Sequence, residues 1–156
     1  MKLIFKQRFF SWLDNYDIYD EQGYVIYSIK GKISWGHRLE IYDQHQHIGT
    51  LKEEVLTWRP KFHMYIHDQY IGCIEKELTL LKPQFKLDCR GWRVTGNWLA
   101  WEYQIQDKQN LVIADISKDI SQLGDTYVLD IVHPDDALYV LMIVLAIDAE
   151  KCSHNH

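Results

Sequence analysis

Cysteine is scarce in this sequence, and its scarcity limits both the fold and the expected location. The three cysteines, Cys73, Cys89 and Cys152, are odd in number and irregularly spaced. A disulfide framework is therefore not expected, and a reducing cytoplasm is the natural compartment. The opening residues, Met1 to Lys6, are interrupted by charge almost at once, so we expect no secretory signal peptide.

Proline is also rare, and no segment separates domains. The 156 residues contain three Pro and eight Gly, and no low-complexity or Pro/Gly/Ser-rich linker divides them. We therefore expect one domain over residues 1–150, followed by a short flexible tail at 151–156. A chain of this length can bury a real core without disulfides or metals.

Positive charge and long apolar runs are lacking too. The net charge of -5 argues against general nucleic-acid binding, which needs a basic field. The longest apolar run, residues 137–147, has eleven residues, whereas a bilayer span needs about 20. We therefore expect no transmembrane helix.

Aromatic residues, in contrast, are abundant, and several of them mark a repeat. An apolar–hydroxyl–tryptophan triplet recurs at steps of 23 residues, centred on Ser11, Ser34 and Thr57. Between the triplets runs an alternating apolar segment, a polar turn and a second apolar-rich segment, as in Tyr16 to Ile29. Self-similarity at a fixed period indicates one structural unit written several times. Here the unit is typical of a β-hairpin.

The repeat predicts about twelve short antiparallel strands. Such a sheet would leave two exposed edges unless it closes, so we expect a mainly β fold in which hairpin repeats form a closed antiparallel barrel. The expected strand ranges are 3–10, 15–20, 24–32, 38–43, 47–56, 61–67, 70–79, 84–88, 91–97, 101–106, 111–119 and 126–132.

The last segment predicts an α-helix inside that barrel. His133-Pro134-Asp135-Asp136 is typical of a helix start, with carboxylates at the positive end of the helix dipole. Residues 137–147 have no polar face, and such a helix must be buried on all sides. A twelve-stranded barrel leaves a lumen, which a helix about 10 Å wide can fill. We expect this central helix at about 135–149.

Motifs along the whole chain carry a resemblance to a known family. They are Phe5-Lys6-Gln7, Tyr16 to Gly23, Lys82-Pro83, Gly91-Trp92, Gly124 to Ile131 and Val144 to Asp148. Together with the barrel and its apolar helix, they resemble the tubby C-terminal-like superfamily. The closest likeness is to the bacterial branch of the LURP-one-related proteins, relatives of the phospholipid scramblases. The resemblance implies the fold and no settled activity.

A candidate binding site lies at one end of the expected barrel. Hairpin tips gather at one end of an up-and-down barrel, and the corners between repeats gather at the other. Tryptophan beside Lys and Arg at the corners suits a membrane interface with anionic lipid. The alternative is that these tryptophans fold inward to cap the barrel mouth, while nearby carboxylates weaken the basic field. The corner residues concerned are Trp12, Trp35, Trp58, Trp98 and Trp101, with Arg38, Arg59, Lys61 and Lys82.

In its sharpest form, the lipid hypothesis surrounds one anionic headgroup with cations and places two indoles at the interface. The cations are Arg59, Lys61, Lys82 and Lys86, and the indoles are Trp35 and Trp58.

Catalytic and metal sites are not expected. The sequence has no Ser nucleophile elbow, phosphate-cradling glycine loop or metalloprotease helix. The recurring hydroxyls, such as that of Thr57, indicate a structural task at the corners, where they bond backbone. His45, His47 and His67 lie in or beside expected turns without a complete ligand set. The ending Cys152-Ser-His-Asn-His156 lacks a supporting shell. We expect neither metal nor cofactor.

The sequence therefore predicts a non-enzymatic cytoplasmic binding module that lies at the membrane periphery. Its expected partner is an anionic phospholipid or a membrane-associated protein. One alternative is a protein-interaction scaffold that uses the outer wall and ignores lipid. Another is a scramblase-like lipid mover. The oligomeric state does not follow from the sequence.

Overall fold

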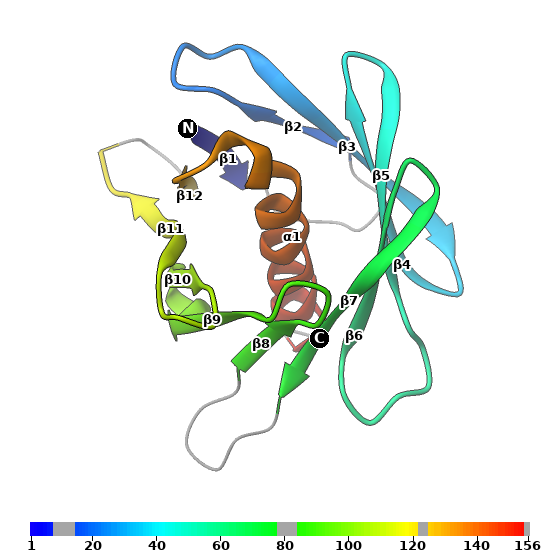
Figure 1. Ribbon diagram of the computed structural model, residues 1–156. Helices are drawn as coiled ribbons and strands as arrows, with labels where there is room; N and C mark the ends of the chain where they lie inside the picture. Colours follow the sequence, from blue (N-terminus) through cyan, green and yellow to red (C-terminus); the bar gives the residue numbers. More distant parts are fainter. Residues whose placement is uncertain (8–14, 78–83, 122–124, 155–156) are drawn as a thin grey trace.

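The computed structural model describes residues 1–7, 15–77, 84–121 and 125–154. Within these residues, twelve strands close into one barrel around a C-terminal helix (Figure 1). The strands are β1 Lys2–Gln7, β2 Asn15–Tyr19, β3 Val25–Ser34, β4 Gly36–Asp43, β5 Gln46–Glu53, β6 Lys61–Ile66, β7 Gln69–Glu77, β8 Gln84–Leu87, β9 Trp92–Asn97, β10 Glu102–Gln106, β11 Val112–Asp119 and β12 Asp125–Ile131.

Barrel order follows chain order, and every neighbouring pair is antiparallel. β1 closes the barrel by pairing with both β12 and β2. Each observed strand begins within two residues of its predicted start. The predicted closed antiparallel barrel of about twelve strands is confirmed.

Alternation of side chains builds the inner wall of the barrel. In β6, Phe62 and Met64 are fully buried, whereas Lys61 and His63 alternate with them on the outer face. The hairpin turns are formed by short polar residues: the Asp20 carboxylate accepts the N–H groups of Gln22 and Tyr24 at 2.9 and 2.8 Å. This local geometry explains why the repeat was readable from the sequence.

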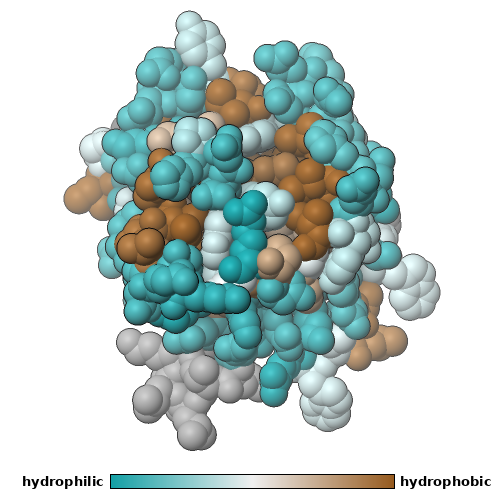
Figure 2. Space-filling model, in the orientation of Figure 1, coloured by the Kyte–Doolittle hydropathy of each residue, from teal (hydrophilic) through white to brown (hydrophobic). Residues whose placement is uncertain are grey.

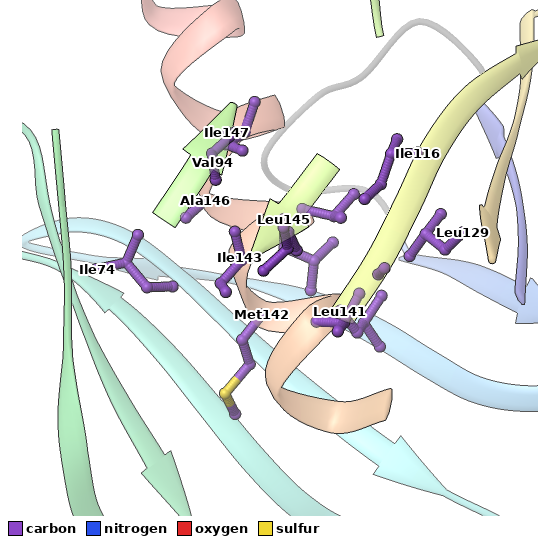
Figure 3. Close-up of a cluster of buried hydrophobic side chains, with 14 of the residues drawn as sticks. Ile74, Val94, Ile116, Leu129, Leu141, Met142, Ile143, Leu145, Ala146 and Ile147 are labelled. Carbon is purple, nitrogen blue, oxygen red and sulfur yellow. The ribbon is translucent and has the colours of Figure 1, made fainter. Parts of the chain in front are cut away.

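The central helix begins where the chain leaves β12. A single 3₁₀ turn, η2 (Pro134–Asp136), leads into α1 (Ala137–His154). Every residue from Val140 to Glu150 is buried. Figure 3 shows Leu141, Met142, Ile143 and Leu145 of the helix beside strand residues of the inner wall, among them Ile74, Val94, Ile116 and Leu129. The predicted barrel plug is confirmed.

The helix is longer than the sequence predicted. We expected it to end at about residue 149 and a flexible tail to follow at 151–156, but α1 continues to His154. Two contacts explain the extra turn: Glu150 Oε1 accepts a hydrogen bond from Lys76 Nζ at 2.9 Å, and the Lys151 ammonium lies 4.6 Å from the Trp101 ring centroid. These contacts hold the last turn against the barrel wall.

A buried carboxyl group lies near this end of the helix. The Asp148 side chain is only 1% exposed. Burial raises the pKa of Asp148 to about 7, against a smaller opposing effect of Lys151. Burial, with a further contribution from Asp148, also raises the pKa of the Tyr103 hydroxyl well above its ordinary value. The C-terminal half of α1 therefore carries a carboxyl group, that of Asp148, whose burial favours the neutral form.

Among the described residues, no helix has the length and apolar character needed to cross a bilayer.

Truncating a residue on the helix should destabilise the whole barrel. We expect Leu141→Ala, at a fully buried site, to lower the free energy of unfolding by about 2–5 kcal/mol, because it removes apolar contact and leaves a cavity. Leu111→Ala, at a site 64% exposed, is the matched control and should change it by less than about 0.5 kcal/mol. Equal effects in chemical denaturation would contradict the plugged barrel.

Asp148 should make stability fall as pH rises. Its folded pKa of about 7 exceeds the ordinary value of 3.8, so the folded state holds a proton that the unfolded chain has lost between these values. The contribution of the protonated Asp148 carboxyl to the free energy of unfolding is complete below about pH 4 and is lost as pH rises through about 7. Asp148→Asn removes this loss and should be more stable than wild type at pH 8, by on the order of 2–4 kcal/mol.

Urea denaturation at pH 4, 6 and 8 measures this difference between variant and wild type. The exposed Asp130→Asn serves as the control. If the free energy of unfolding of Asp148→Asn differed from that of wild type by the same amount from pH 4 to pH 8, the raised pKa of Asp148 would be contradicted.

Candidate functional site

The connections between strands divide the barrel into two different ends. Hairpin turns such as Asp20 to Tyr24 lie at the end where α1 begins, and there Arg90 forms a 2.8 Å ion pair with Asp136. The other end, here called the corner end, carries the β3–β4, β5–β6 and β9–β10 connections, and α1 ends there. The corner end is where the sequence placed the candidate site.

The β3–β4 corner is a tight turn that presents Trp35 to solvent. Trp35 is 88% exposed, and Gly36 follows it with a φ of +86°. A Cβ at Gly36 would lie 3.0 Å from Val55 Cγ2 and 3.1 Å from the Glu53 carbonyl oxygen. Glycine therefore lets this corner pack directly against the β5–β6 corner.

The β5–β6 corner is a loop whose apolar side chains point outward. The predicted strand 47–56 was too long, because β5 ends at Glu53 and residues 54–60 form the loop. Leu56 is 99% exposed in the left-handed region at φ +71°, and Trp58 is fully exposed. The Thr57 hydroxyl donates to the Arg59 carbonyl at 2.6 Å, which is the structural task predicted for the repeated hydroxyls.

Two histidine–glutamate pairs fix the base of this loop. His63 Nε2 lies 2.7 Å from Glu54 Oε2, and His63 Nδ1 lies 3.2 Å from the Tyr70 hydroxyl. On the other side, Glu53 accepts from the His37 backbone N–H at 3.0 Å and pairs with the His37 ring. Burial alone would raise the pKa of Glu53, but these contacts with His37 bring it below its usual value. The pairs tie the loop to both β4 and β6.

The tryptophans of the predicted corners have two different fates. Trp98 and Trp101 are 5% and 3% exposed, and Trp101 stacks on Tyr127 with ring centroids 3.9 Å apart. For these two, the alternative that tryptophans cap the barrel mouth is correct. Trp35 and Trp58 instead point into solvent, whereas Trp12 lies outside the described residues.

The exposed apolar side chains on the two adjoining corners form what we call the corner patch: Trp35, Val55, Leu56 and Trp58. Sequence reasoning found the two tryptophans but missed Val55 and Leu56, because their apolar character fitted the end of a strand. Figure 2 shows one face of the molecule, which is mostly hydrophilic and on which polar side chains divide separate apolar areas.

The predicted cations lie near acidic partners. Arg59 Nη1 and Lys61 Nζ lie 4.0 and 3.9 Å from Glu75 Oε1, and Lys86 Nζ lies 3.7 Å from Glu77 Oε1. Such surface pairs contribute about 0–1 kcal/mol, so the cations stay available to an anion while the local field is partly neutralised.

The structure separates the predicted headgroup residues into two groups. Arg59 and Lys61 flank the corner patch at the end of its loop, whereas Lys86 is two strands further along the outer wall, in register with Glu75. Lys82 lies outside the described residues. One headgroup surrounded by all of these side chains is therefore not what the described residues present.

His47, one of the three histidines predicted in or beside turns, lies in β5 and makes local contacts. His47 Nε2 lies 2.9 Å from the Thr50 hydroxyl, and its ring packs against Tyr42 with centroids 5.4 Å apart. Across the described ranges, no group of three or more His, Cys, Asp or Glu side chains is arranged to hold a metal ion.

Comparison with known proteins agrees with the fold. An X-ray structure of a protein from Arabidopsis thaliana is similar at a TM-score of 0.67 with 15% sequence identity, over 96% of this chain and 90% of that one. At this identity, the likeness supports the fold alone. No curated protein matches the sequence significantly. The LURP-one-related family model matches residues 1–148, and the chain therefore belongs to the LURP-one-related family.

Proposed function

We propose that the protein is a non-enzymatic, cytoplasmic binding module that attaches to membranes containing anionic phospholipid through its corner patch. Family membership and the tubby-like barrel fit a binding module. The filled barrel interior supports a surface function, because the plug residues occupy the space where a lipocalin-type barrel would hold a ligand. As part of the same proposal, the protein belongs to the bacterial branch of the LURP-one-related family, and that family is related to the phospholipid scramblases.

One observation carries the proposal: three large apolar side chains on two touching loops are almost completely exposed. Trp35, Leu56 and Trp58 have 88% of their surface or more in solvent. Contiguous exposed apolar groups mark sites of protein or membrane interaction. Leu56 also holds a left-handed backbone, which is costly for a branched side chain and is typical of functional loops.

A membrane suits this patch for a physical reason. Indole rings favour the headgroup region of a bilayer, where their apolar body and N–H group are both satisfied. Moving each large apolar side chain out of water contributes about 1.5–3 kcal/mol. Arg59 and Lys61, beside Trp58, would then meet the phosphates of anionic lipid.

A protein partner is the second candidate, and the acidic neighbours of the cations favour it. Glu75 lies within 4.0 Å of both Arg59 and Lys61, which lowers the positive potential that anionic lipid would feel. A membrane-associated protein with an apolar contact region would suit the same patch. A scramblase-like lipid mover is less well supported, because the long apolar run is the plug of the barrel.

Co-flotation with vesicles tests the proposal. Wild-type protein should float with vesicles containing phosphatidylglycerol, more strongly at low salt than at physiological salt, and only weakly with neutral vesicles. Trp35→Ser/Trp58→Ser should weaken partitioning by about tenfold or more for each indole removed. The matched control is Tyr24→Ser/Leu111→Ser, which removes two side chains exposed by 71% and 64% at the opposite end.

Charge reversal separates the two terms of the proposed interaction. Arg59→Glu/Lys61→Glu should remove the salt-sensitive part of binding, whereas Lys2→Glu/Lys6→Glu on β1 should have a smaller effect. Unchanged flotation of the double-serine variant would overturn the membrane proposal. Failure of the wild type to bind either vesicle, with protein partners captured through the same patch, would favour the scaffold.

A further inference from the structure

Two histidine–glutamate pairs lie directly beside the corner patch. His37, two residues after Trp35, contacts the Glu53 carboxylate through its ring Nδ1. Glu54 begins the β5–β6 loop, and its Oε2 lies 2.7 Å from His63 Nε2. The four paired side chains are partly exposed, by 19–42%. Protons from solvent therefore reach both pairs, and the charge of the pairs acts on the surface beside the patch.

The contacts of His63 suit both the neutral and the protonated imidazole. Besides Glu54, the ring contacts the Tyr70 hydroxyl, which lies 3.2 Å from Nδ1. In the neutral ring, Nε2–H donates to Glu54 and Nδ1 accepts from the hydroxyl of Tyr70. In the protonated ring, Nδ1–H donates to the Tyr70 oxygen instead, because a hydroxyl can both donate and accept. His63 can therefore gain a proton without losing either partner.

Histidine is the residue type in these pairs that changes charge near neutral pH. Imidazole ordinarily does so between about pH 5 and 8. Burial alone would raise the pKa of Glu53, but hydrogen bonds from His37 hold it below its usual value. Beside His63, the Tyr70 hydroxyl and the Cys73 thiol stay neutral, because burial is the main cause that raises the pKa of both, that of Cys73 to about 11. Acidification over this range therefore adds positive charge at the imidazoles.

Charged side chains around the two imidazoles nearly cancel one another while the rings are neutral. Four are cations, Arg38, Lys52, Arg59 and Lys61, and three are carboxylates, those of Glu53, Glu54 and Glu75. Lys32 on β3 and Glu40 on β4 lie next to Arg38 and balance each other. The net charge of this surface is therefore +1 with neutral imidazoles and +3 when both are protonated.

We propose that these two pairs make attachment through the corner patch stronger at acidic pH, because protonated His37 and His63 add positive charge where the patch meets an anionic phospholipid surface. This pH response rests on the proposed membrane attachment and names what regulates it. The apolar side chains of the patch do not titrate, so attachment persists at neutral pH and strengthens on acidification. Each cation near an anionic surface strengthens binding about fivefold, so two protonated imidazoles should strengthen it by about tenfold or more.

Flotation with phosphatidylglycerol vesicles at pH 7.5 and pH 5.5, at constant salt, tests the pH response. This lipid keeps its phosphate charge over the range. The wild-type partition coefficient should be about tenfold or more higher at pH 5.5, with no comparable gain on neutral phosphatidylcholine vesicles. A wild-type coefficient that is the same at both pH values would overturn the pH response and leave attachment intact. An equal gain on neutral vesicles would also overturn it, because charge would then not be the cause.

Substitution of the two histidines locates the effect. His37→Gln/His63→Gln cannot gain charge, so the ratio of its partition coefficients at the two pH values should fall below about twofold. His37→Arg/His63→Arg carries the charge permanently and should bind at pH 7.5 about tenfold or more strongly than wild type, a gain that misfolding does not produce. The control His45→Gln/His67→Gln, at exposed hairpin turns, should keep the wild-type ratio. A wild-type ratio in His37→Gln/His63→Gln would overturn the pH response.

Asp148 also gains a proton over this range, because burial raises its pKa to about 7, but it lies inside the barrel. Asp148→Asn should therefore keep the wild-type ratio. Loss of the ratio in this variant, with its retention in His37→Gln/His63→Gln, would assign the effect to the helix and overturn the role of the pairs.

Failure of the pH response is distinguishable from failure of the attachment. Trp35→Ser/Trp58→Ser should weaken binding at both pH values and keep their ratio, because it removes apolar contact and no charge. Absence of wild-type flotation at both pH values would contradict the attachment itself, and the pH response would fall with it.

Discussion

The burial of a helix that is apolar on every side is the constraint on which this structure depends. A helix with a polar face can lie on a surface, but α1 has none from Val140 to Ile147 and must be enclosed. A closed barrel gives it apolar contacts all round and leaves no unpaired sheet edge within the described strands. The enclosed helix also fills the lumen of the barrel, so a binding site has room only on the outer wall or at the ends of the barrel.

At the corner end, the relative size of the apolar and electrostatic terms decides what kind of contact to expect. Each large side chain of the corner patch is worth about 1.5–3 kcal/mol when it leaves water. Each surface ion pair of Arg59 or Lys61 is worth about 0–1 kcal/mol, and Glu75, within 4.0 Å of both cations, partly neutralises their charge. Contact through the patch would therefore draw most of its free energy from apolar burial, and the two cations would set the preference for anionic lipid.

The fold could be predicted from the sequence because its signals are local. Alternation in segments such as Tyr16 to Tyr19, polar turns and the unbroken apolar run at 137–147 each specify an element without distant partners. The last helical turn was missed because its contacts, Glu150 with Lys76 and Lys151 with Trp101, come from distant parts of the chain.

The site could be predicted only in part, because tryptophans at different corners meet different surroundings. Trp35 stands before Gly36 in a tight corner and points outward, whereas Trp101 finds Tyr127 to stack upon and points inward. The pair of His37 with Glu53 joins β4 to the end of β5, and the pair of His63 with Glu54 joins β6 to the β5–β6 loop. Neither the pairs nor the exposure of Leu56 has a local sequence signal.

Hydrogen–deuterium exchange of the protein with and without phosphatidylglycerol vesicles tests the central claim most directly. We expect the α1 amides to stay protected in both states, because the barrel remains closed around its helix. We also expect residues 54–59 to gain protection on vesicles, because the corner patch makes the contact. Loss of protection in α1 upon binding, with no change at residues 54–59, would mean that the helix leaves the barrel for the bilayer and would contradict attachment through the corner patch.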